Sequence, residues 1–105
     1  AIDRRAIIEA EFNGQTLPAQ LDPGPDSPFH NPDLMNAFVT HDPDRANALL
    51  DAAGLTKRDD EGFRTFPDGE RMTWFMHLTD MTGNGPAQFI VDDWSRVGVR
   101  CVARI

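Results

Sequence analysis

The chain has 105 residues, of which 40% are hydrophobic, 17 are acidic and 10 are basic, giving a formal net charge of −7. Such a composition can bury one modest core and argues against a second domain. Because nucleic-acid binding depends on clustered Lys and Arg, the acidic balance argues against a nucleic-acid partner. The sequence has no run of about 18 apolar residues and no basic leader. We therefore expect this segment neither to span a membrane nor to carry its own export signal.

The first predicted element is a helix over residues 4–12. Asp3 can cap it by accepting hydrogen bonds from the amides of the first turn, and Gly14 can end it. Residues 15–41 follow, a proline-rich stretch with almost no helical or alternating pattern, so we expect a long loop of extended and turn structure. Connections beyond about 12–15 residues are uncommon inside compact domains. This loop is therefore expected to be functional or to wrap over a lobe.

The clearest predicted helix lies within residues 41–55. Asp42 fits the N-cap, Pro43 fits the first helical position, where no amide hydrogen bond is lost, and Gly54 fits the left-handed residue that ends a helix. The helix has one apolar stripe, which we expect to be buried and which consists of Ala46, Leu49, Leu50 and Ala53.

A β-hairpin is predicted next. Residues 63–66 and 72–79 have strand character, and Pro67-Asp68-Gly69-Glu70 between them can reverse the chain. Apolar side chains fall on both faces of the second strand, so we expect a helix layer on each side of it. The charged run at residues 57–61, just before the hairpin, is interpreted as a solvated turn.

The last elements complete a β-α-β unit. Residues 87–97 predict a helix with Asp92, Asp93 and Arg96 on its outer side, and residues 99–105 predict a final strand. The two strands that flank this helix should pair in parallel. The predicted fold class is therefore α/β: a single domain over residues 1–105, in which the hairpin and the β-α-β unit pack with two further helices.

No set of residues predicts catalysis, a cofactor or a metal site. The three histidines, His30, His41 and His77, lack metal-ligand spacing. Cys101 with His77 would make a nucleophile and a base, but Cys101 falls on an apolar strand face, where a thiolate is costly. Asp92 and Asp93 are adjacent on a helix and point about 100° apart, so they cannot act as a catalytic pair. We expect a protein that is not an enzyme.

One turn is a candidate ligand site. Residues 79–85 follow a strand and open a helix, which is where α/β proteins commonly bind ligands. Thr79, Thr82 and Asn84 are the side chains that could contact a ligand there, together with backbone amides. An ordinary strand-to-helix turn without a ligand fits the same residues, so both interpretations stay open.

Four segments of the sequence, taken in order, resemble one family. Ala1-Ile2-Asp3-Arg4, the helical segment 41–55, Pro67-Asp68-Gly69 and Trp94-Ser95-Arg96-Val97-Gly98-Val99 are similar to motifs of the family 5 extracellular solute-binding proteins. Members of this family bind oligopeptides, dipeptides, nickel complexes or related solutes. The resemblance covers essentially the whole chain and is specific for the family, whereas the loop at residues 15–41 identifies no solute.

The resemblance implies a function and a place in a larger protein. It implies a piece of the C-terminal lobe of a type II periplasmic binding protein, in which two lobes close on a solute, most often a peptide, and deliver it to the permease subunits of an ABC importer. It also implies a periplasmic location. A fragment of this kind should associate with itself or expose apolar surface when isolated. The alternative is a free-standing α/β interaction module that has no small-molecule ligand and binds a partner chain through the long loop or the strand edge at residues 99–105.

Overall fold

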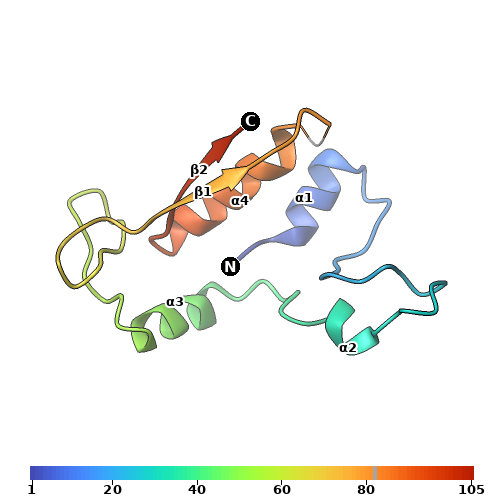
Figure 1. Ribbon diagram of the computed structural model, residues 1–105, viewed down its shortest axis with the longest axis horizontal. Helices are drawn as coiled ribbons and strands as arrows, with labels where there is room; N and C mark the ends of the chain where they lie inside the picture. The colour runs from blue at the N-terminus through green and yellow to red at the C-terminus, as the bar shows by residue number, and fades with distance from the viewer. Residues whose placement is uncertain (82) are drawn as a thin grey trace. The chain divides into compact units, whose positions relative to one another are not determined.

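The computed structural model describes residues 1–81 and 83–105 of the chain (Figure 1). In these residues the elements are α1 (Arg4–Glu11), α2 (Pro32–Met35), α3 (Pro43–Ala52), β1 (Thr73–His77), α4 (Gly85–Arg96) and β2 (Arg100–Arg104). The chain divides into two compact units, one of residues 3–41 and one of residues 1–2 with 42–105. Each unit is described by itself, and the single domain expected over residues 1–105 stays a prediction.

Helix α1 begins and ends as its sequence predicts. The carboxylate of Asp3 accepts a hydrogen bond from the amide of Ala6 at 3.1 Å, which satisfies one of the unpaired amides of the first turn. After the helix the chain turns through two residues with positive φ, Asn13 and Gly14, and the Gly14 amide donates to the Ile8 carbonyl. The predicted cap and stop are confirmed.

The loop at residues 15–41 is mostly extended and turn structure, with one exception. Asn31 caps the single-turn helix α2 by accepting hydrogen bonds from the amides of Asp33 and Leu34, and Pro32 occupies its first turn. The sequence interpretation missed this helix because four residues are too few to show an apolar period.

Asp22 organises the same loop. Its side chain is 1% exposed and accepts hydrogen bonds from the amides of Gly24 at 2.8 Å and Asn31 at 2.7 Å. The oxygen that accepts from Gly24, Oδ2, also lies 2.7 Å from Nδ1 of His30. Burial by itself would raise the pKa of Asp22, but the hydrogen bonds from Asn31, His30 and Gly24 outweigh it and hold the pKa below the ordinary value of 3.8. One carboxylate thus ties together residues 22–31.

Acid should loosen this loop. Because the folded-state pKa of Asp22 is lowered, the stabilisation is fully present above pH 3.8 and is lost as the pH falls through the lowered value. We expect the amide resonances of Gly24 and Asn31 to titrate together in an NMR pH series, with a midpoint below 3.8. Asp22→Asn should abolish this titration. A midpoint at or above the ordinary aspartate value would contradict the geometry.

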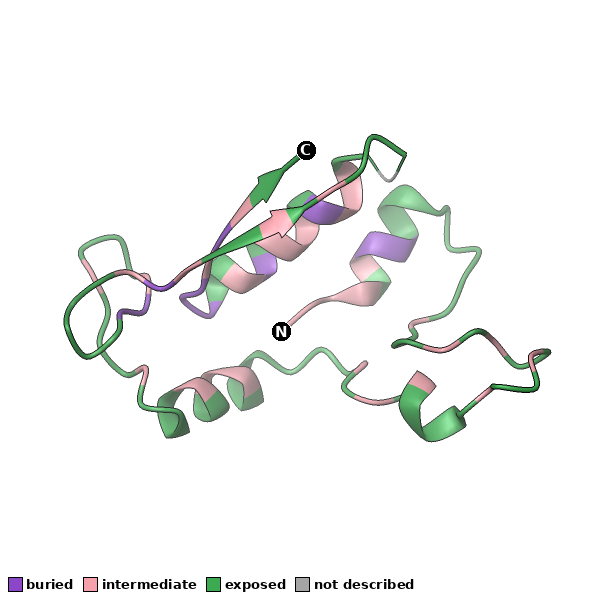
Figure 2. Ribbon diagram, in the orientation of Figure 1, coloured by how far each residue is buried: buried purple, intermediate pink, exposed green. Residues whose placement is uncertain are grey.

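The other unit contains the predicted β-α-β arrangement. Strands β1 and β2 pair in parallel, in a register that runs from Thr73 opposite Arg100 to His77 opposite Arg104, and α4 between them in sequence packs against β2 (Figure 1). Figure 2 shows buried positions gathered where α4 passes into β2, which is where the core residues Val97 and Val99 lie. The predicted α/β fold class is confirmed.

The predicted hairpin is present in reduced form. Residues 63–66 form no regular strand, but antiparallel bridges join Arg58 to Arg64 and Thr65 to Arg71, and the Met72 amide donates to the Arg64 carbonyl. In the segment before the hairpin, side-chain hydrogen bonds replace part of the backbone pairing. Asp59 accepts hydrogen bonds from the amides of Glu61 and Phe63 and from Nε of Arg71.

The interpretation of residues 57–61 as a merely solvated turn was therefore wrong for Asp59. This side chain is only 21% exposed, and it anchors the turn to Arg71, whose guanidinium also lies 4.9 Å from the ring centroid of Phe63. The other four residues of the charged run are exposed, and a run of charged residues does not reveal which of its members turns inward.

Arg64 is the most deeply buried large side chain of the described residues, with 1% exposure. Its guanidinium donates to the carbonyls of Val97 at 2.8 Å and Leu55 at 2.6 Å, and to the side chains of Asn47 at 2.8 Å and Asp51 at 2.6 Å. The charge is thus surrounded by acceptors, as a buried cation requires. One side chain joins α3, the segment after it and the end of α4.

Three expectations about this unit were wrong or only partly right. Asp93, placed on the outer side of its helix, is 4% exposed and accepts a hydrogen bond from Nη1 of Arg96 at 2.8 Å. A buried carboxylate is tolerated when it is paired in this way. Helix α3 has no fully buried residue: Ala46 and Leu50 of its apolar stripe are partly buried against the core, but Leu49 is 58% exposed. The helix layer expected on each side of β1 is also not seen in the described residues, where Phe75 and His77 are exposed.

Candidate functional site

The predicted ligand turn lies at the carboxyl edge of the parallel strands. The amide of Leu78 donates to the carbonyl of Arg104 at 2.7 Å, so pairing continues one residue beyond β1. The chain then leaves the sheet, with Thr79, Met81 and Asn84 exposed before α4 begins. Thr82, the third predicted site residue, lies outside the residues that the structure describes. The edge itself is where parallel α/β sheets bind ligands.

Asn84 occupies the N-cap position of α4 without capping it by its side chain. Its carbonyl accepts the first intrahelical bond, from the Gln88 amide at 3.0 Å, while its side chain makes no capping hydrogen bond. Pro86 in the first turn has no amide to satisfy. The side-chain amide of Asn84 and the positive end of the helix dipole are therefore both available to an oxygen atom of a ligand.

Thr79 and Asn84 stand at the two ends of this turn, so the structure places both at the same edge. Thr79 already takes part in an interaction within the protein, and it would contribute to a ligand site from a fixed position. In the part of the chain that the structure describes, His, Cys, Asp and Glu side chains form no group that could hold a metal ion. None of the helices described in residues 1–81 and 83–105 has the length and apolar character of a transmembrane span.

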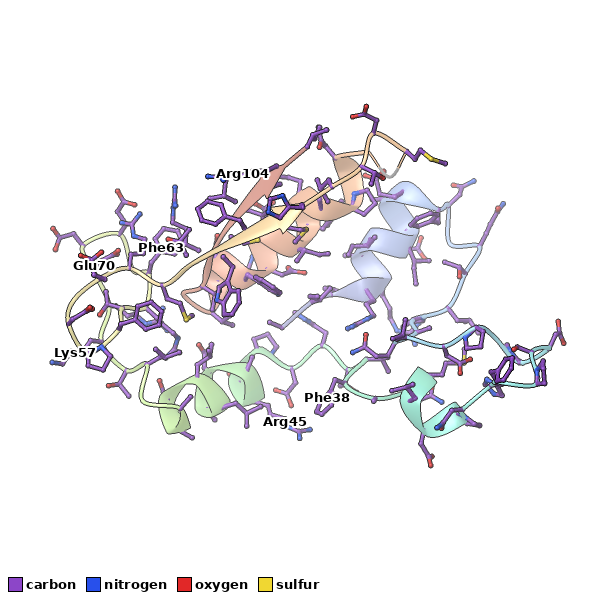
Figure 3. All side chains as sticks on the ribbon, in the orientation of Figure 1. Phe38, Arg45, Lys57, Phe63, Glu70 and Arg104 are labelled. Carbon is purple, nitrogen blue, oxygen red and sulfur yellow. The ribbon has the colours of Figure 1, made fainter. Side chains whose placement is uncertain are left out.

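The sequence analysis missed a second feature near the same edge. On the sheet face that carries Phe75 and His77, the guanidinium of Arg104 lies 3.8 Å from the centroid of the Phe75 ring (Figure 3). This is a cation–π contact at an exposed position. The alternation along β1 places Phe75 and His77 on one face and could be recognised in the sequence. The partner of Phe75, Arg104, lies on β2, so the contact can be found only when the register of the two strands is known.

Cys101 is excluded as a nucleophile by its surroundings. It is 6% exposed and pairs with Trp74 in the strand register. Burial raises the pKa of its thiol, which keeps the sulfur protonated at neutral pH. The Cys101 thiol is therefore a structural group of β2 and not a nucleophile.

The unit of residues 3–41 has a separate groove of about 540 Å³ with a mixed polar and apolar lining. Its charged lining residues are Asp3, Arg4 and Arg5. Arg4 is partly engaged, since its Nη1 donates to the carbonyl of Phe38 at 3.3 Å. The remaining guanidinium donors can attract a carboxylate or another anion. No motif in the sequence pointed to this groove, because its residues come from the start of α1 and from both ends of the long loop.

These features together define an α/β segment that can contact a small solute at the carboxyl edge of a parallel sheet. The family model described as "Bacterial extracellular solute-binding proteins, family 5 Middle" matches residues 1–104, and the chain belongs to this family. Among solved structures, the chain is similar to one titled "oligopeptide-binding protein OppA", with 35% sequence identity and a TM-score of 0.76. No curated protein matches the chain.

The similarity to OppA covers 98% of this chain and 16% of the OppA chain. The chain thus spans less than a fifth of that relative, and the resemblance seen in the sequence is confirmed at the level of family and fold. Both the family and OppA are named for binding and not for catalysis. The three predicted ligand residues, Thr79, Thr82 and Asn84, are tested by none of these comparisons and stay a prediction.

Proposed function

We propose that the chain is part of the substrate-binding component of an ABC importer, which captures a small solute by closure of two lobes and performs no catalysis. The observation that carries this proposal is the family 5 match over residues 1–104, to which the structural similarity to OppA adds the fold. Because OppA is titled as oligopeptide-binding, an oligopeptide is the solute that the proposal adopts. The location would then be periplasmic, and the partners would be the permease subunits.

In this proposal the segment belongs to the C-terminal lobe, and the β1–α4 turn forms part of the wall of the ligand cleft. A peptide presents carbonyl oxygens, amides and a terminal carboxylate. The side-chain amide of Asn84 can both donate to and accept from such groups, and the N-terminal turn of α4 favours negative charge. Thr79 would add a hydroxyl group at the other end of the turn, and Thr82, which lies outside the described residues, is proposed to add a second.

The turn is tested by peptide binding to the polypeptide encoded by the complete reading frame. Asn84→Ala should weaken the affinity for short peptides, measured by isothermal titration calorimetry, by about fivefold to tenfold, which is the loss of about one hydrogen bond. Ser95→Ala is the matched control, since Ser95 is exposed near the opposite end of the same helix. Equal affinities for both variants and the parent would show that the turn does not contribute to the ligand site. Absence of any peptide binding would instead show that the solute is not an oligopeptide.

The interaction-module alternative has one observation in its favour. The parallel sheet has only the strands β1 and β2 in the described residues, and Phe75 and Arg104 on one face are exposed. Parallel sheets are normally covered on both faces, so this face can receive a partner chain. A module of this kind would bind a protein and no small solute, and the peptide titration separates the two functions.

A further inference from the structure

The unit of residues 1–2 and 42–105 has an apolar groove of about 400 Å³. Its lining residues are all Ala, Val, Leu, Met or Trp. The buried core residues Met72, Val97 and Val99 lie at its floor, and Leu49 of α3 and Trp74 of β1 line its open part. The groove is therefore continuous with the hydrophobic core of this unit.

The groove does not have the composition of a solute site. Ligand pockets combine apolar walls with a few polar groups that orient the ligand, and here the lining offers none except the indole N–H groups of tryptophan. It has instead the features of a core that lacks one layer. Leu49 is 58% exposed and Trp74 is 56% exposed, although the residues beneath them are buried. Large side chains left open beside a core mark a packing surface.

We infer that this groove is covered by a helix of the longer polypeptide to which the segment belongs. The OppA chain extends far beyond the 16% that the segment matches, so a family member of that length has other elements available. The side chains that line the groove cannot form the hydrogen bonds that the backbone of an extended covering segment would need. A helix needs none of them, because its backbone N–H and C=O groups bond within the helix. A second copy is disfavoured by charge, because each copy has a formal net charge of −7. The inference depends on the chain being part of a family 5 protein and does not depend on which solute that protein binds.

Leu49 gives a direct test, because the segment alone leaves it exposed. Leu49→Glu should lower the Tm of the complete polypeptide by several degrees, because it places a charge where the inferred helix packs. Ala48→Glu is the matched control: it lies on the same helix, is exposed and does not line the groove. It should leave the Tm of the complete polypeptide nearly unchanged.

A second measurement does not depend on stability. In the complete polypeptide, a thiol reagent should modify Leu49→Cys about tenfold more slowly than Ala48→Cys, because only the first thiol would be covered. Equal labelling rates, or a Leu49→Glu variant as stable as Ala48→Glu in the complete polypeptide, would overturn the inference. A reading frame no longer than this segment would do the same.

Discussion

Replacing Arg64 by methionine should destabilise the protein by about 3 kcal/mol or more. Methionine has a similar length and is apolar, so the substitution keeps most of the volume and removes the charge and all four side-chain hydrogen bonds. The carbonyls of Val97 and Leu55 would then lose their donors in a place that water reaches poorly, since Arg64 is 1% exposed. Small domains have only about 5–15 kcal/mol of total stability. The loss should therefore be visible as a large shift of the urea midpoint.

The matched control for this substitution is Arg45→Met. Arg45 is an exposed residue of α3, and its substitution removes one charge of the same sign (Figure 3). Its effect on the free energy of unfolding should stay within about 0.5 kcal/mol, the usual range for surface changes. If Arg64→Met were as mild as Arg45→Met, the network that joins α3 to the end of α4 would not contribute to stability.

Gly98→Ala is expected to have the second largest effect. Gly98 has a φ of +85°, and a Cβ built there would lie 2.6 Å from Nη1 of Arg58 and 3.0 Å from Cγ of Arg64. The guanidinium of Arg58 can move because it is exposed, but Arg64 is held by its hydrogen bonds. The left-handed conformation costs an alanine about 1 kcal/mol and the crowding adds about 1–3 kcal/mol.

A second glycine separates these two costs. Gly54 has a φ of +90°, and a Cβ there would meet nothing within 4 Å. Gly54→Ala should therefore cost only the conformational part, about 1 kcal/mol. Thermal unfolding of both variants measures the difference. If the two substitutions lowered the free energy of unfolding equally, the close approach of Gly98 to Arg64 would not add to the cost of a side chain there.

The local elements could be predicted from the sequence because their signals are local. The caps of α1 and α3 depend on Asp3 and Asp42, which accept from amides three residues along the chain, and such spacings can be recognised directly. The β-α-β unit was also predictable, since its strand and helix periods change clearly at residues 79–85 and at Gly98. The parallel pairing then followed from the connection.

The buried polar groups could not be predicted, because their partners are distant in sequence. Arg64 bonds Val97, 33 residues away, and Asp59 bonds Arg71, 12 residues away. Charged residues are usually exposed, so a single sequence favours solvent for each of them. Asp93 shows the same effect on a helix whose polar face seemed clear.

The position of the candidate site could be predicted from the sequence, but the side chains that meet near it could not. The strand-to-helix turn follows from the topology, but Arg104 beside Phe75, and the grooves of the two units, depend on contacts between separate elements. Leu49 is a further example: its helical stripe predicted burial, but its side chain is 58% exposed, whereas Ala46 and Leu50 of the same stripe pack against the core.

The most direct test of the central claim is native mass spectrometry of the polypeptide encoded by the complete reading frame, incubated with a mixture of short peptides. The account predicts a complex with one bound peptide that is released on denaturation, and small-angle scattering should show a more compact particle when the peptide is bound, as lobe closure requires. A polypeptide that binds no small solute and forms a stable complex with a protein partner would contradict the account and favour an interaction module.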